Sequence, residues 1–171
     1  MKGKVLFCMM SMLGMALASC SSDSSENYSE NDRVVIVPDR SLGNDVAEFF
    51  NAELPKSGMV SEGFFVGKSK QSLCHVINST DELKALYTGN NPLPAIDFSN
   101  QTLIVGQHYV PESFYQVERM ELRRKGGGYV LDLYVPEPEI MGFAFGYMYY
   151  WCLTTKLESS KMSVNVIVYS E

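Results

Sequence analysis

The thiol and imidazole groups beyond residue 20 are the first candidates for chemistry, and they are few: Cys74, His75, His108 and Cys152. A thiol beside an imidazole is the arrangement of a cysteine nucleophile, and clusters of the same groups bind zinc. The spacing favours neither use. Cys74 and His75 are neighbours, which point to opposite faces of a strand, and the sequence has no C-x-x-C motif, no H-E-x-x-H motif and no glycine-rich elbow. We therefore expect no catalytic site, no metal site and no cofactor.

Aromatic residues form the most distinctive pattern. They occupy every second position of one segment: Phe143, Phe145, Tyr147, Tyr149 and Trp151. In a strand all five side chains project from one face. Such a face could stack on sugar rings or anchor a protein partner. The alternative is that the face belongs to the hydrophobic core, because aromatic side chains are usually buried. The exposure of the two tyrosines and the tryptophan distinguishes these interpretations.

The start of the chain has the pattern of a secretion signal. Residues 5–17 are almost wholly apolar, but this run is shorter than the roughly 18–20 residues of a membrane-spanning helix. It ends in Leu17-Ala18-Ser19-Cys20, which resembles the lipobox of bacterial lipoproteins. The resemblance implies cleavage before Cys20, acylation of its thiol and attachment to the outer membrane. The alternative is ordinary secretion through an A-x-A site ending at Ala18.

Removal of the leader at 1–19 changes the charge of the chain. It removes Lys2 and Lys4 but no acid, so the net charge goes from −6 to −8, with 12 Lys and Arg against 20 Asp and Glu. A nucleic-acid binder needs a basic face, so we expect no nucleic-acid partner. Residues 20–32 are polar and acidic, and we interpret them as a flexible tether. The tether also resembles surface-export signals of some Bacteroidota lipoproteins, which leaves periplasm-facing and surface-facing orientations open.

The cysteines gain a second interpretation outside the cytosol. Cys8 leaves with the leader and Cys20 carries the lipid, so Cys74 and Cys152 remain. Two thiols in an oxidising compartment suggest a disulfide. The alternative is two separate buried thiols that act as small hydrophobic side chains.

A single domain at 33–171 must position these residues. Hydrophobic spacing predicts a helix over 44–54, and Ser79 with Glu82 forms a capping box for a second short helix. Residues 55–72 read mostly as loop, with a short strand near 64–66. The three glycines at 126–128 predict a hairpin turn. Strands are expected at 34–37, 73–77, 103–110, 115–124, 129–135, 143–153 and 162–168.

The expected class is α+β: a mostly antiparallel, curved or partly closed sheet with two short helices packed on it. Short connections between successive strands favour antiparallel pairing. A local basic cluster at Arg119, Arg123, Arg124 and Lys125 is either the solvated edge of the hairpin or a docking site for an acidic partner.

From about residue 73 to 168 the order of elements is similar to the C-terminal domain of PrcB-like protease-complex regulatory subunits. The resemblance rests on Val76-Ile77-Asn78-Ser79 before a helix, Ile96-Asp97-Phe98-Ser99 before an apolar strand, and a terminal Val-x-Val strand. It implies a small β-rich domain that contacts another protein, sometimes a protease. The family's glycine-pair turn is replaced here by Pro111-Glu112-Ser113-Phe114-Tyr115. The whole chain also resembles the small lipoproteins of Bacteroidota.

The sequence therefore predicts a cell-envelope lipoprotein with one α+β domain that is not an enzyme and acts as a binding or protein-interaction module. Two alternatives remain. A protease-regulating domain would carry an exposed, rigid loop at 111–115. A glycan-binding surface protein would use the aromatic row at 143–151.

Overall fold

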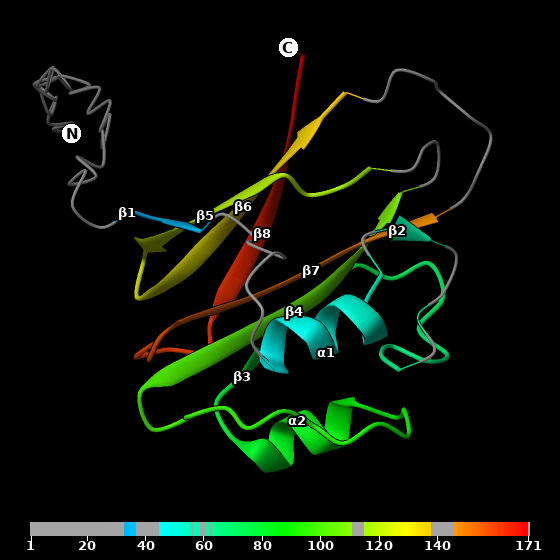
Figure 1. The fold of residues 1–171 in the computed structure, drawn as a ribbon. Coiled ribbons are helices and arrows are strands. Elements are labelled where there is room, and N and C mark those ends of the chain that lie inside the picture. The colour runs from blue at the N-terminus through cyan, green and yellow to red at the C-terminus, as the bar shows by residue number, and fades with distance from the viewer. Residues whose placement is uncertain are drawn as a thin grey trace, which may run out of the picture.

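The fold was analysed in a computed structural model, which describes residues 33–36, 45–55, 57–58, 61, 63–110, 115–137 and 146–170. The expected signal peptide, Cys20 and the acidic tether lie outside the described residues. Within the described part of the chain, no helix is both long and apolar enough to cross a membrane. The architecture is α+β, with two sheets and two short helices, as Figure 1 shows. The expected fold class is thus confirmed.

The strands form two sheets rather than one. The first sheet has the order β1 (Arg33–Ile36), β5 (Arg119–Lys125), β6 (Gly128–Pro136) and β8 (Met162–Tyr169). The second sheet has the order β2 (Ser57–Gly58), β7 (Gly146–Thr155), β4 (Gln101–Val110) and β3 (Leu73–Ile77). The end strands β8 and β3 contact each other. The two sheets therefore meet at these end strands. This contact corresponds to the partly closed sheet that the sequence predicts.

One strand pair departs from the antiparallel expectation. All described pairs are antiparallel except β6 and β8, which run parallel. The chain leaves the first sheet after β6, crosses to the second sheet for β7 and then returns for β8. Strand β7 lies between β6 and β8 in the sequence but belongs to the other sheet. The chain therefore returns to the first sheet in the direction of β6, and β8 pairs with β6 in parallel.

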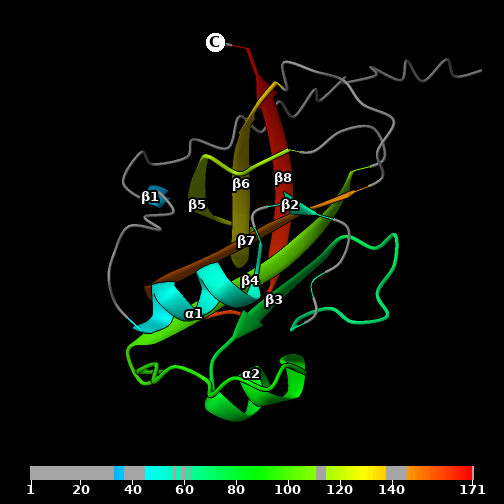
Figure 2. The ribbon, with the colours of Figure 1, turned by 45° about the vertical axis from the view of Figure 1, so that its right-hand side comes forward.

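Both helices cover the same face of the second sheet. Helix α1 (Asp45–Glu53) buries Phe49 and Phe50, and α2 (Thr80–Leu86) buries Leu83. The capping box is confirmed: the Ser79 hydroxyl accepts a hydrogen bond from the Glu82 amide at 3.2 Å. Figure 2 shows both helices on the side of the second sheet that faces away from the first sheet.

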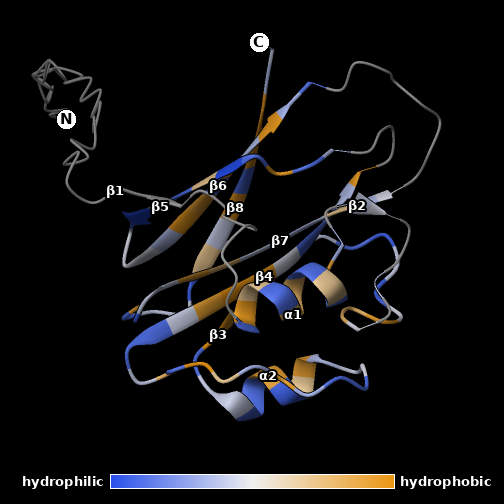
Figure 3. Ribbon diagram, viewed as in Figure 1, coloured by the Kyte–Doolittle hydropathy of each residue, from blue (hydrophilic) through white to orange (hydrophobic). Residues whose placement is uncertain are grey.

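The second sheet is consequently buried on both faces. One core lies between its outer face and the helices, and the other lies between the two sheets. In the middle of β4, Ile104 faces the core between the sheets, whereas Leu103 and Val105 face the helices. Figure 3 shows the resulting bands of apolar residues on α1, β4 and β6. The expectation that the 103–110 strand is buried on both faces is confirmed.

The segment 55–72 differs in detail from the expectation. The only strand described there is β2, at residues 57–58, and a turn replaces the short strand expected near 64–66. Phe65 has a positive φ of 56°, a left-handed conformation that interrupts extended structure.

Candidate functional site

The described part of the aromatic row belongs to the core. Tyr147 is 8% exposed and Tyr149 is 1% exposed, and Trp151 is half-buried against the same cluster. Phe143 and Phe145 lie outside the described residues. Of the two interpretations, the core one therefore holds for Tyr147 and Tyr149, whereas Trp151 packs against the same core but stays partly exposed.

Helix α1 and the residues after it cover this face. The Trp151 ring stacks on Phe50 with 4.7 Å between the ring centroids, and Tyr149 stacks on Phe65 at 6.5 Å. Burial raises the pKa of Tyr149 to about 12, so its phenol stays neutral at physiological pH. A sugar ring could stack on Tyr149 only if Phe65 moved, and on the Trp151 face that meets Phe50 only if α1 moved.

The two thiols are free in the structure. Cys74 lies on β3 and Cys152 on β7, and β4 runs between these strands. With neighbouring strands about 4.8 Å apart, the two Cα atoms are separated by roughly 10 Å or more. A disulfide requires Cα atoms within about 7 Å. Of the two alternatives for the cysteines, the disulfide is therefore not formed in the structure, and the thiols are separate: Cys152 lies in the core between the sheets and Cys74 packs against it.

Burial also works against thiol chemistry. It raises the pKa of Cys74 and raises that of Cys152 to about 12, whereas a nucleophilic cysteine needs a lowered pKa. Desolvation lowers the pKa of both His75 and His108, so the imidazoles are neutral at physiological pH. Among the described residues, no three His, Cys, Asp or Glu side chains converge in a way that could hold a metal ion.

The arginines of the basic cluster are paired with acids. Arg119 forms an ion pair with Glu121. The Arg123 guanidinium donates two hydrogen bonds to Asp132, at 2.6 and 3.2 Å. Arg124 contacts Glu158 at 2.8 Å. Because each arginine already has a carboxylate partner, this cluster offers an acidic partner less free positive charge than its composition indicates.

The pairs formed by Arg119 and Arg123 belong to a polar network on the outer face of the first sheet. The two carboxylates, Glu121 and Asp132, are each only 3% exposed. Tyr134 donates to Glu121 at 3.1 Å, and the Asn165 side-chain amide donates to Asp132 at 2.9 Å. A buried network with satisfied partners fixes the register of its strands. The alternation of Arg119, Glu121 and Arg123 along one strand is the sequence signal for it.

A tight loop at residues 65–70 lies next to the second sheet and carries an exposed apolar side chain, Val66. We call it the 65–70 loop. The amide of Lys68 donates to the carbonyl of Phe65 at 3.0 Å, which closes a turn. Phe65 and Lys70 both have φ of 56°, a conformation that costs a residue other than glycine roughly 1–2 kcal/mol. Val66 stands at the turn and is 54% exposed.

Two buried side chains of the second sheet, Gln107 and Tyr147, form hydrogen bonds with the backbone of this loop. The Gln107 amide donates to the carbonyls of Lys68 and Gln71, at 2.9 Å in each case. The Tyr147 hydroxyl accepts a hydrogen bond from the Lys70 amide at 2.7 Å. Left-handed backbone persists where the surroundings fix it, and such places are often functional. These hydrogen bonds therefore make the 65–70 loop rigid rather than flexible.

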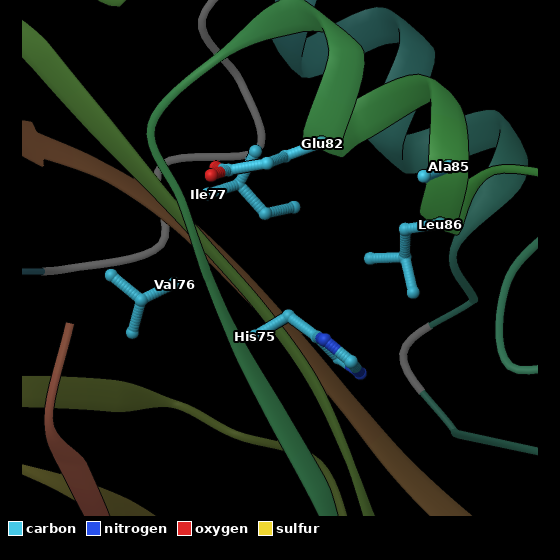
Figure 4. A pocket seen from close by; sticks show the side chains of 6 residues that line it. All are labelled: His75, Val76, Ile77, Glu82, Ala85 and Leu86. Carbon is cyan, nitrogen blue, oxygen red and sulfur yellow. The ribbon is translucent and has the colours of Figure 1, made fainter.

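A pocket of about 280 Å³ opens between β3 and α2 (Figure 4). Its lining residues are His75, Val76, Ile77, Glu82, Ala85 and Leu86. His75 connects it to the loop, because the His75 ring lies 5.7 Å from the ring of Phe65. The pocket is at the lower limit of those that enclose small ligands, which begin near 300 Å³. It is large enough for one apolar side chain of a partner.

The loop and the pocket together form the candidate site, which we call the loop–pocket surface. Neither part was indicated by the sequence: the loop depends on contacts between distant segments, whereas the pocket lies between two consecutive elements, β3 and α2. The rigid loop expected at 111–115 cannot be compared, because residues 111–114 lie outside the described residues. No protein family model, no curated protein and no solved structure matches this chain.

Proposed function

We propose that this chain is a cell-envelope lipoprotein, anchored through Cys20, whose α+β domain is a non-catalytic protein-interaction module. The partner binds at the loop–pocket surface. The proposal depends above all on one observation: the exposed Val66 sits on a loop that buried Gln107 and Tyr147 hold in a left-handed conformation.

The chemistry of this surface suits a protein better than a small substrate. Val66 supplies an exposed apolar contact, and its loop is ordered before binding, so little conformational entropy is lost on association. The adjoining pocket can receive one anchoring side chain of the partner, which is how hot-spot residues bind. The described thiols have raised pKa values, which argues against a cysteine nucleophile.

A protease-regulating role is the more specific form of the proposal. Its support is the rigidity of the 65–70 loop, because a loop that enters a cleft must keep its shape there. A glycan-binding role through the aromatic row loses support, because Tyr147 and Tyr149 are buried.

Photo-crosslinking in intact envelopes tests the binding surface. A photoreactive amino acid is placed at Val66 of the full chain and, as the control, at exposed Thr155. Thr155 lies on β7 about 27 Å along the strand from Tyr147. We expect a discrete protein adduct from position 66 and none from position 155. Equal labelling at both positions, or no adduct at either, would reject the loop–pocket surface as the binding site.

Mass spectrometry of the protein from its native membrane tests the anchor separately. We expect a first residue Cys20 with acyl groups on its sulfur and amino nitrogen. An intact Met1 or an unmodified thiol at position 20 would reject the lipoprotein assignment without affecting the crosslinking result.

A further inference from the structure

The outward side of β8 is an unprotected strand edge. In the described part of the chain β8 ends the first sheet, and it is the longest of the four end strands: β1 has four residues, β2 has two and β3 has five, against eight in β8. Its sequence, Met-Ser-Val-Asn-Val-Ile-Val-Tyr, has no charged residue, proline or glycine. Proteins usually protect long edges with charges, prolines or bulges.

The hydrogen bonds at both ends of the β6–β8 pair define which backbone groups point outward. The Tyr129 amide donates to the carbonyl of Lys161, and the Glu137 amide donates to the carbonyl of Tyr169, both at 2.9 Å. In a parallel ladder the residues of one strand alternate between facing and not facing the neighbour. The odd-numbered residues of β8 therefore bond to β6. The N–H and C=O groups of Met162, Val164, Val166 and Val168 point away from it.

Side-chain exposure indicates which part of this edge is available. Val168 is 50% exposed, and among the residues that the structure describes it is one of two exposed large apolar side chains, with Val66. The end strand β3 of the second sheet contacts β8. Figure 2 shows this contact near the start of β8, whereas the last residues of β8 extend away from β3 toward the C-terminus. Within the described residues, the second half of β8 thus combines outward backbone groups that have no strand beside them with an exposed valine.

We propose that β8 pairs antiparallel with β8 of a second copy of this chain, on a two-fold axis at Ile167. In this register Val166 and Val168 of one copy form hydrogen-bonded pairs with Val168 and Val166 of the other. Ile167 faces its own counterpart. The pairing covers the exposed Val168 with an apolar neighbour and places no like charges together, because β8 has none.

The choice of a second copy follows from this self-complementarity. An antiparallel pair of identical strands has two-fold symmetry, which is the commonest symmetry of protein dimers. Val–Val and Ile–Ile contacts across the axis are favourable pairs on a pleated surface. On the outer face of the paired strands, Asn165 of one copy lies opposite Tyr169 of the other. The polar groups of these two side chains therefore face each other.

Disulfide trapping in intact envelopes tests the register. Ile167→Cys brings two thiols together at a pair whose Cα atoms are about 4.5 Å apart, within the range of a disulfide. Asn165→Cys is the matched control, because its counterpart lies about 14 Å away in this register. After mild oxidation of the full chain, we expect about tenfold more disulfide-linked dimer with I167C than with N165C or the unsubstituted chain.

A proline tests the backbone pairing. Val166→Pro in the I167C chain removes an outward N–H without removing a bond to β6, and prolines are tolerated at such edge positions. We expect it to abolish the dimer band. Val168→Pro makes the same change at a more exposed position, and serves if V166P fails to fold by limited proteolysis. Equal bands for I167C and N165C, a linkage to a different protein, or a dimer band that survives a folded proline variant would overturn the proposal.

Discussion

The phenol ring of Tyr150 lies directly across the backbone of Gly106. A Cβ atom placed on Gly106 would come within 2.1 Å of the Tyr150 ring, far inside van der Waals contact. The ring crosses β4 at this glycine, and its hydroxyl donates to the carbonyl of Leu73 on β3 at 3.2 Å. One side chain thus ties β7 to β3 over the strand between them. Glycine at position 106 is required for this crossing rather than for an unusual φ.

Gly106→Ala should destabilise the domain strongly. The added methyl group must displace the Tyr150 ring from a close-packed core, and overpacking of this kind costs about 1–3 kcal/mol. Urea unfolding, followed through the fluorescence of Trp151, measures the loss; this is the single tryptophan of the chain. Gly58→Ala on β2 is the control, because no atom lies within 4 Å of the Cβ position there. A similar loss in both variants would contradict the steric explanation.

Tyr147→Phe should release the 65–70 loop without unfolding the domain. The substitution removes the acceptor of the Lys70 amide and retains the packed ring. The expected loss of unfolding free energy is about 1 kcal/mol, the value of one hydrogen bond. Hydrogen exchange of the Lys70 amide should accelerate, while amides in the middle of β4 keep their protection. Unchanged protection of Lys70 would show that the loop does not depend on this contact.

The domain should lose stability at alkaline pH. The pKa of Cys152 rises from 9.0 to about 12 on folding, and that of Tyr149 rises from 10.0 to about 12. Between pH 9 and about 12 the unfolded chain releases protons that the folded chain retains. The free energy of unfolding therefore falls with rising pH, by up to about 1.4 kcal/mol per pH unit for each group. Below pH 9 the contribution of Cys152 is fully present.

Cys152→Ala separates this effect from general alkaline damage. The variant loses core packing at every pH, but it also lacks one of the titrating groups. We expect its urea midpoint to fall less steeply than that of the unsubstituted chain between pH 9 and about pH 11. Parallel curves for the two proteins would indicate that the Cys152 thiol does not contribute.

Local chemistry made several elements predictable from the sequence. Ser79 and Glu82 locate the start of α2 because a capping box satisfies its own backbone groups within one turn. The glycines at 126 and 127 locate the β5–β6 turn because both adopt positive φ, at 56° and 73°. Each of these signals acts between residues close in sequence, so no knowledge of the fold is needed to read it.

The burial of the aromatic row could not be decided by its spacing. Alternation places Tyr147, Tyr149 and Trp151 on one face, but it does not say what covers that face. The other face of β7 carries Met148 and Tyr150, which are also buried. A strand that is apolar on both faces indicates an inner strand, and that signal favours the core interpretation.

The 65–70 loop was inaccessible to sequence reasoning for a different reason. The 65–70 loop depends on Gln107, which is 39 residues from Lys68, and on Tyr147, which is 77 residues from Lys70. Such contacts follow from the order of strands in the second sheet, and patterns in the sequence do not reveal that order. The same applies to the parallel pairing of β8, which requires knowing that β7 belongs to the other sheet.

Asp132→Asn should cost far more stability than its exposed counterpart Asp81→Asn. Asp132 is almost fully buried and accepts hydrogen bonds from both Arg123 and Asn165, so the neutral amide leaves the guanidinium without its counter-charge. Hydrogen bonds to charged groups contribute about 1.5–3 kcal/mol, and a loss of this size is expected in urea unfolding. Asp81 contacts Lys84 at 3.7 Å with its side chain 94% exposed. Its replacement should change stability by less than about 1 kcal/mol, and by still less at high salt. Equal losses in the two variants would mean that the polar network on the first sheet adds no more than a solvated surface pair.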